Sequence, residues 1–99
     1  MNTSLLQTIL DSFDVQSDDH FSVGGMSPFK DINPQDYIFE IPGDNRKFYQ
    51  GVCASSKDIT KAFEEIQFDL KHVTHIKVAQ YRKDENKRNQ CIKTLFFKY

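Results

Sequence analysis

The chain has 99 residues and a formal net charge of −1, with 38% hydrophobic and 27% charged residues, nine Phe and four Tyr. These values predict one globular domain with a single core, and they exclude a disordered chain, which would have few bulky apolar residues. No basic segment followed by an apolar run opens the sequence, and no apolar stretch approaches the roughly 20 residues of a membrane span. We therefore expect a cytoplasmic protein, of a cell or of a host cell, without membrane contact.

The first predicted element is a helix over residues 4–13. Apolar residues recur there at helical spacing: Leu5, Leu6, Ile9, Leu10 and Phe13. Ser4 and Gln7 are spaced as in a capping box, in which two side chains satisfy the free backbone N–H groups at a helix start. We therefore expect the helix to begin at Ser4.

Residues 14–36 follow as an acidic arm. Gly24-Gly25, Ser27-Pro28 and Asn33-Pro34 each interrupt regular structure. A stretch of this length without secondary structure is uncommon inside a compact domain. Either residues 20–23 form a short edge strand, or the arm itself has a function.

Two hairpins are predicted further along the chain. Strand-like runs at 37–41 and 46–54 flank the turn sequence PGDN, and Gly51 marks a bulge in the second run. Runs rich in β-branched and aromatic residues at 73–81 and 91–99 flank the charged segment YRKDENKRNQ at 81–90. We therefore expect the segment 81–90 to be the end of the second hairpin.

A second helix is predicted between the two hairpins. Its apolar stripe consists of Ile59, Ala62, Phe63, Ile66 and Leu70. Ser55, with Asp58 three residues later, supplies an N-terminal cap. Lys71 and His72 lie where cations favour the carbonyl end of a helix, so we expect the helix to end there.

The resulting order α-β-β-α-β-β predicts an α+β fold with a four-stranded, mainly antiparallel sheet and two helices packed on one face. We expect a single α+β domain over residues 1–99. Its predicted core consists of Leu6, Ile9, Leu10, Phe13, Phe39, Phe63, Ile66, Leu70, Ile76, Val78 and Phe96.

Catalytic and metal chemistry is not indicated. The sequence contains no nucleophile-elbow, metalloprotease, phosphate-loop or dinucleotide motif, so we expect neither an enzyme nor a cofactor. His72 and His75, with Asp18, Asp19 and His20, offer ligand atoms, but a helix end and a strand start do not make the two histidines converge. No metal site is predicted.

The two cysteines do not form a paired motif. Free cysteine is often buried, so we expect Cys53 and Cys91 to be small buried strand residues. A pairing of the two across strands stays open, because the sequence does not fix their separation.

Charge is distributed unevenly along the chain. Residues 1–45 contain eight acids and one cation, whereas residues 71–99 contain eight cations and two acids. The acidic arm is therefore expected to lie near the basic hairpin, or to complement a second copy of the chain, which makes self-association an open alternative.

One functional hypothesis is recognition of nucleic acid by the second hairpin. Its candidate phosphate contacts are Arg82, Lys83, Lys87 and Arg88. Tyr81 and Tyr99 are available for stacking on bases. Asp84 and Glu85 dilute the positive charge, so a polar hairpin end is the simpler interpretation.

The preferred hypothesis is that the protein binds another protein through the acidic arm. Aromatic residues and Met dominate such interfaces. The candidate partner-binding residues are Asp18, Asp19, Phe21, Met26 and Phe29. The alternative is that the three apolar residues only pin the arm to its own core. An inhibitor or regulator, of the immunity, antitoxin, phage or mobile-element type, is the simplest function of a domain without motifs, by analogy alone.

Overall fold

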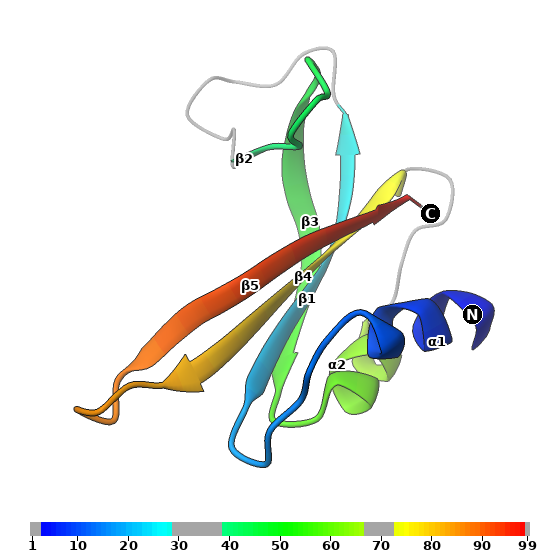
Figure 1. Cartoon of the computed structure of the whole chain (residues 1–99). Coiled ribbons are helices and arrows are strands. Elements are labelled where there is room, and N and C mark those ends of the chain that lie inside the picture. The colour runs from blue at the N-terminus through cyan, green and yellow to red at the C-terminus, as the bar shows by residue number, and fades with distance from the viewer. Residues whose placement is uncertain (1–2, 29–38, 67–72, 99) are drawn as a thin grey trace.

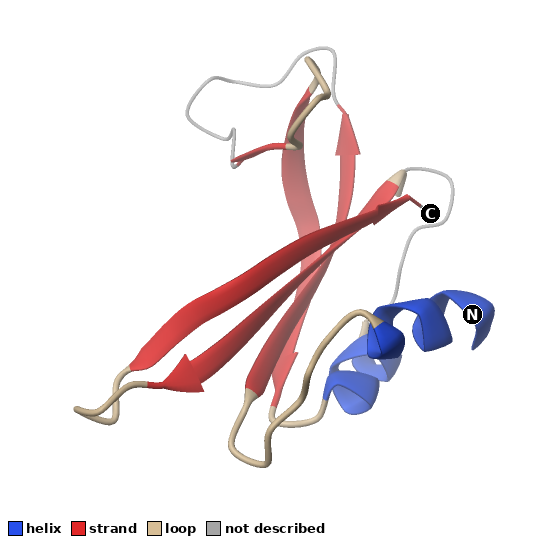
Figure 2. Ribbon diagram, viewed as in Figure 1, coloured by secondary structure: helices blue, strands red, loops and turns tan. Residues whose placement is uncertain are grey.

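The computed structural model describes residues 3–28, 39–66 and 73–98. It has a mixed α+β fold with two helices and one curled antiparallel sheet (Figures 1 and 2). The elements are α1 (Thr3–Asp11), β1 (His20–Pro28), β2 (Phe39–Glu40), β3 (Lys47–Ser56), α2 (Ile59–Glu65), β4 (His75–Lys83) and β5 (Asn89–Lys98). In the part of the chain that is described, no helix has the length and apolar character needed to cross a membrane.

The sheet has five strands in the order β2-β3-β1-β4-β5, rather than the four predicted. Figure 1 shows that β4 and β5 run obliquely across β1 and β3, so the sheet is strongly twisted. Twist of this kind is the ordinary consequence of strand chirality. The β4–β5 hairpin extends beyond the rest of the sheet and ends in the turn between Lys83 and Asn89 (Figure 1).

Strand β1 corrects the prediction for residues 20–28, which were expected to belong to an arm or, at 20–23, to a short edge strand; residues 29–36 of the predicted arm lie outside the described residues. It is the central strand, paired with β3 from Phe21 to Pro28 and with β4 from His20 to Met26. Gly24 and Gly25, which favour turns in isolation, are buried within this strand. Ladder hydrogen bonds to two neighbouring strands satisfy their backbone groups, so tertiary pairing outweighs low strand propensity.

Both predicted hairpins are present. Strands β2 and β3 pair through Phe39–Phe48 and Glu40–Lys47, and β4 pairs with β5 along its whole length. The prediction of a bulge at Gly51 is confirmed, because Gly25 faces Val52 while Met26 faces Gln50. A second bulge lies at Ile92, since Gln80 faces Lys93 and Tyr81 faces Cys91.

The helix starts differ from the predicted caps. Ser4 lies inside α1, and the side chain of Gln7 donates to Asp11 Oδ1 at 2.8 Å, so the capping box is wrong. Asp58, not Ser55, is the N-cap of α2, since its Oδ1 accepts from the backbone N–H of Thr60 at 2.8 Å and of Lys61 at 3.2 Å.

Helix α2 is also shorter than predicted. It ends at Glu65, and the backbone at Ile66 is extended. The predicted last turn, with Leu70, Lys71 and His72, lies outside the described residues. Phe63 and Ile66 of the predicted stripe are nevertheless buried.

One hydrophobic core contains side chains from both helices and from the strands of the sheet. Its buried members are Ile9, Phe13, Phe21, Val23, Ile59, Ala62, Phe63, Ile66, Ile76 and Val78, with Leu5, Leu6, Leu10, Ala54, Val73, Leu95 and Phe97 packed against them. The predictions for Leu70 and for the side chain of Phe39 lie outside the described part.

Phe96 was predicted for this core, and that prediction is wrong. Ile76 and Val78 face the core, and their partners on β5 are Phe97 and Leu95. Phe96 instead pairs with Lys77, so strand alternation directs it to the other face of the sheet. We call that face, which carries His20, Ser22 and Tyr81, the outer face.

Candidate functional site

The acidic and basic parts of the chain meet at Asp19, whose side chain is fully buried. Arg82 donates to both carboxylate oxygens, from Nε at 2.9 Å and from Nη2 at 3.0 Å. Gln80 donates to Oδ2 at 2.8 Å, and so does the backbone N–H of Gln16 at 2.8 Å. These donors, Arg82 above all, hold the pKa of Asp19 far below its ordinary range.

Further contacts tie the segment after α1 to the last two strands. The backbone oxygen of Asp14 accepts from Gln80 at 2.8 Å and from Arg82 at 3.3 Å. Lys93 donates to the backbone oxygen of Ser12 at 2.7 Å. The expectation that acidic residues before β1 lie near the basic hairpin is therefore confirmed for Asp19 within one chain.

The same packing changes the candidate partner-binding residues. Phe21 and Met26 are each 1% exposed. The arm hypothesis required both side chains to be exposed, so that they could anchor a partner, and in this fold neither is available for that contact. Phe21 packs edge to face on Phe13 with ring centroids 5.7 Å apart, which matches the alternative that such residues hold their own core. Asp18 is exposed, and Phe29 lies outside the described residues.

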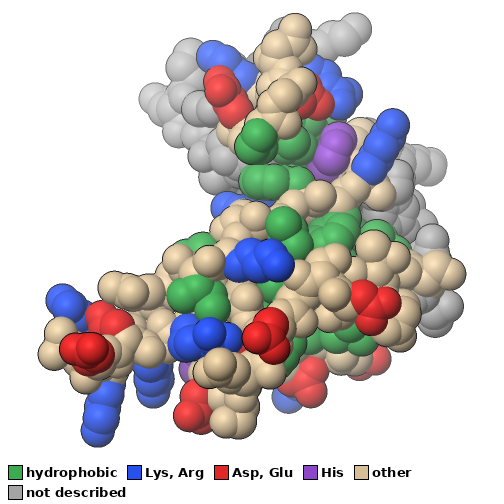
Figure 3. All heavy atoms as spheres, in the orientation of Figure 1, with side chains coloured by type: hydrophobic (Ala, Val, Ile, Leu, Met, Phe, Trp, Pro, Cys, Tyr) green, Lys and Arg blue, Asp and Glu red, His purple; other side chains and the backbone are tan. Residues whose placement is uncertain are grey.

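The basic hairpin is partly neutralised by its own chain. Arg82 is bound to Asp19, and Arg88 Nε lies 3.3 Å from Asp84 Oδ2. Lys83 and Lys87 have no ion pair with any residue of the described ranges. Figure 3 accordingly shows Lys or Arg and Asp or Glu side chains intermixed at the tip. Of the four residues predicted to contact phosphate, Lys83 and Lys87 are therefore the two whose ammonium groups form no ion pair in the described part of the chain.

Strand β5 forms an edge of the sheet. Within the described residues it pairs only with β4, so the backbone edge that points away from β4 faces no other strand. Residues Asn89–Lys93 are exposed, and Ile92, at the bulge, is 45% exposed. An edge strand presents unpaired N–H and C=O groups that can pair with another chain.

A pocket of about 280 Å³, with a mainly apolar surface and several polar side chains around it, opens beside the start of β1. It is lined by His20, Phe21, Ser22, Ser55, Tyr81 and Asn89. The Nδ1 atom of His20 is buried and has no hydrogen-bond partner among the described residues. The sequence signal for this site was the alternation of polar His20 and Ser22 with apolar Phe21 and Val23, which was obscured by the breaker residues that follow.

Both cysteines lie on the surface, so their predicted burial is wrong. Cys53 Sγ and Ser22 Oγ share a hydrogen bond of 3.1 Å, and Cys91 Sγ and Thr94 Oγ1 share one of 3.2 Å. Cys53 is on β3 and Cys91 on β5, with β1 and β4 between them, so they do not face each other across neighbouring strands.

The predicted absence of a metal site is untested at His72, which lies outside the described residues. Across residues 3–28, 39–66 and 73–98, no group of three or more His, Cys, Asp or Glu side chains is placed to hold an ion. The ring of His75 packs edge to face on Phe48, with centroids 5.1 Å apart. Burial, reinforced by the charge of Arg46, lowers the pKa of His75 below its ordinary value.

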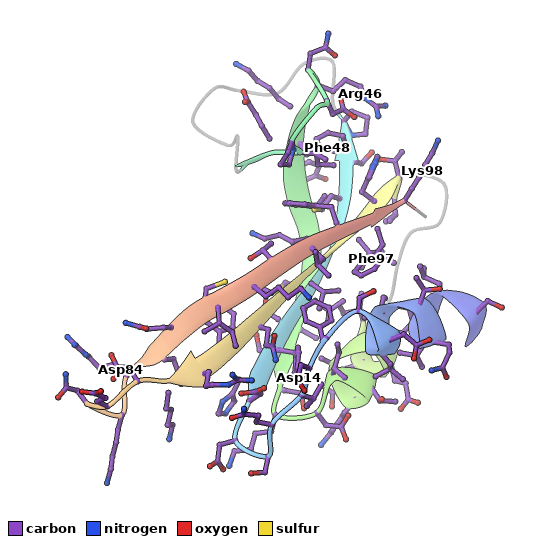
Figure 4. All side chains as sticks on the ribbon, in the orientation of Figure 1. Asp14, Arg46, Phe48, Asp84, Phe97 and Lys98 are labelled. Carbon is purple, nitrogen blue, oxygen red and sulfur yellow. The ribbon has the colours of Figure 1, made fainter. Side chains whose placement is uncertain are left out.

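The far end of the sheet carries a further ion pair. Arg46 Nη2 lies 2.8 Å from Asp44 Oδ2, and its guanidinium lies 5.4 Å from the ring centroid of Phe48 (Figure 4). The hydrogen bonds from Arg46 lower the pKa of Asp44 to about 2. Half of the Arg46 side chain is exposed, so this pair orders the β2–β3 turn more than it stabilises the fold.

These features give three candidate surfaces, namely the β5 edge, the two lysines of the hairpin, and the pocket on the outer face. Comparison with protein-family models, with curated proteins and with solved structures finds no match for this chain.

Proposed function

We propose that the protein is a protein-binding module that recognises an extended segment of a partner along the outer edge of β5. The observation that carries this proposal is a ten-residue edge strand in a hairpin that extends beyond the sheet, with Ile92 exposed on it. Addition of a partner strand satisfies backbone groups that the free protein leaves to water. An inhibitor or regulator of the partner is the simplest role for such a domain.

This proposal relocates the recognition surface from the acidic arm to the hairpin. The arm's apolar candidates Phe21 and Met26 are buried, whereas β5 is exposed from Asn89 to Lys93. The bulge at Ile92 interrupts the regular ladder and turns its side chain toward solvent. A partner is therefore expected to combine backbone pairing with an apolar contact to Ile92.

The proposal is tested with a partner captured from the source cell and then purified. Ile92→Glu is expected to weaken binding of that partner at least tenfold, because it places a charge at the apolar contact. Val15→Glu is the matched control, since Val15 is 49% exposed in the loop between α1 and β1 and lies on no strand. Hydrogen exchange of the complex should show new protection of β5 amides.

Two results would contradict strand addition at β5. One is a partner that protects β3 or the helices and leaves the exchange of β5 unchanged. The other is equal loss of binding for Ile92→Glu and Val15→Glu, which would indicate a general effect of added negative charge.

A second candidate function is binding of single-stranded nucleic acid, which is favoured by the uncommitted ammonium groups of Lys83 and Lys87. Binding through phosphates falls steeply as salt rises. The test is titration of mixed-sequence DNA and RNA at several salt concentrations with the parent chain and with the double variant Lys83→Ala, Lys87→Ala. Micromolar, salt-sensitive binding that this variant loses would rank nucleic acid above protein recognition.

A further inference from the structure

The pocket of about 280 Å³ is built by four strands on the outer face of the sheet. His20 on β1 lies directly opposite Tyr81 on β4, and Ser22 lies opposite Ser55 on β3. Asn89 on β5 lies opposite Lys83 at the end of β4. Directly opposed residues in antiparallel strands project to the same side, so these side chains converge on one face.

Most of the surface of this pocket is apolar, and the side chains around it add several hydrogen-bonding groups but no carboxylate, ammonium or guanidinium group. They offer an imidazole, a phenol, two hydroxyls and a carboxamide, while the side chain of Phe21 is in the core. Buried polar atoms are ordinarily hydrogen-bonded, and Nδ1 of His20, which has no partner among the described residues, is buried behind this wall rather than open to the pocket. The chemistry therefore suits a flat, largely apolar ring whose edge carries hydrogen-bond donors and acceptors.

Size and surroundings narrow the class of ligand. A volume of about 280 Å³ is at the lower limit of small-molecule sites, which suits one ring system. The phenol ring of Tyr81 supplies a face for stacking, and hydroxyl and carboxamide groups match the edge of a nucleobase. Lys83, beside Asn89 on the same face, has no ion pair within the described ranges and is placed for a negative group just outside the pocket.

We propose that this pocket binds one nucleotide, with the base stacked on Tyr81 and hydrogen-bonded to Ser22, Ser55 and Asn89, and with the phosphate at Lys83. The ligand is either a free nucleotide or one unit of a single-stranded nucleic acid. The site shares Asn89 with β5 but uses neither Ile92 nor the unpaired backbone edge of that strand, and it does not depend on recognition of a partner protein there.

The test is a titration of the full chain, followed by backbone NMR, with the four ribonucleoside monophosphates, the matching nucleosides, ribose 5-phosphate and glucose. We expect a nucleoside monophosphate to shift the amide signals of His20, Ser22 and Asn89. Tyr81→Leu should weaken that binding roughly tenfold or more, because stacking is lost. Tyr49→Leu, at a tyrosine outside the pocket, is the matched control and should bind as the parent does.

The variant Lys83→Gln tests the contact with the phosphate separately from the contacts with the base. It should weaken nucleoside monophosphate binding severalfold while nucleoside binding is unchanged. Ser55→Ala, a milder change than Tyr81→Leu, should also weaken nucleoside binding while the chain stays folded. A short single-stranded oligonucleotide that binds more tightly than every monophosphate identifies nucleic acid as the source, and the reverse order identifies a free nucleotide.

Several outcomes would overturn the proposal. These are amide shifts confined to residues outside the pocket, no shift at millimolar nucleotide, equal binding of ribose 5-phosphate, or preferential binding of glucose. Neither protein capture nor the Ile92→Glu variant enters this test, so its failure leaves the function proposed for β5 standing.

Discussion

At the scale of single residues, the stability of the fold is expected to depend on the Asp19–Arg82 ion pair. We expect Asp19→Asn to lower the free energy of unfolding by about 2–3 kcal/mol. This is less than the roughly 3–5 kcal/mol lost when a fully buried pair is broken, because the Arg82 side chain is 32% exposed and water screens it. Denaturant unfolding measures the change.

Asp18→Asn is the matched control for Asp19→Asn. Asp18 is exposed and adjacent in sequence, so its replacement should alter the free energy of unfolding by no more than about 0.5 kcal/mol. Equal effects of the two variants would show that the general charge of the loop, not the contact with Arg82, stabilises this part of the fold.

The same carboxylate makes stability depend on pH. The pKa of Asp19 is lower in the folded chain than in the unfolded chain, where it is about 3.9, so its stabilising contribution is complete above that value and is lost as pH falls below it. We expect the free energy of unfolding to fall more steeply for the parent than for Asp19→Asn as the pH decreases below about 4. Parallel curves for the two chains would contradict a specific role of Asp19.

At the scale of elements, the N-cap of α2 in the structure differs from the N-cap that the sequence pattern predicted. Asp58 accepts two backbone N–H groups of the first turn, so Asp58→Ala should destabilise the protein by about 1 kcal/mol. Ser55 was the predicted cap, but it lies on β3, and Ser55→Ala should change the free energy of unfolding by only a few tenths of a kcal/mol. Thermal and denaturant unfolding of the two variants distinguish the caps, and a larger loss for Ser55→Ala would contradict this assignment.

Elements with strong local signals were predictable from the sequence. Both hairpins combine β-branched and aromatic runs with a polar turn, and the bulge at Gly51 follows from a glycine within such a run. The stripe through Ile59 and Phe63 likewise identified α2, although not its end.

Strand β1 could not be predicted, because its formation depends on neighbours distant in sequence. Gly24, Gly25 and Pro28 favour a turn locally, and only β3 and β4 on either side make an extended backbone favourable there. The pocket on the outer face was missed for the same reason. Its residues His20 and Tyr81 are distant in sequence and meet only once β1 is placed between β3 and β4.

At the scale of the whole molecule, one ion pair among the described residues, Asp19–Arg82, joins the acidic first part of the chain to the basic C-terminal part. Asp19 binds Arg82, and Lys93 donates to the backbone after α1, so acidic and basic segments are joined across the core. Lys83 and Lys87 at the hairpin tip, and Lys98 at the other end of β5, form no ion pair with a described residue, so positive charge stays available to a partner at both ends of the hairpin.

The central position of β1 also predicts how stability is distributed. Val23 on β1 and Val78 on β4 face each other, are fully buried, and lie in strands paired on both sides. Their amides should exchange only through global unfolding, whereas those of Ile92 and Lys93, near the tip on the exposed edge strand, should exchange through local opening of far lower free energy.

Native-state hydrogen exchange measured by NMR at several denaturant concentrations tests this distribution. Exchange of Val23 and Val78 should accelerate with denaturant as steeply as global unfolding does, while exchange of Ile92 should depend on it little, because local opening exposes little surface. Faster exchange at Val23 than at Ile92 would show that the β4–β5 hairpin is the stable unit and that β1 only adds to it. In that case the sheet would open beside β1, and the pocket between His20 and Tyr81 would open with it.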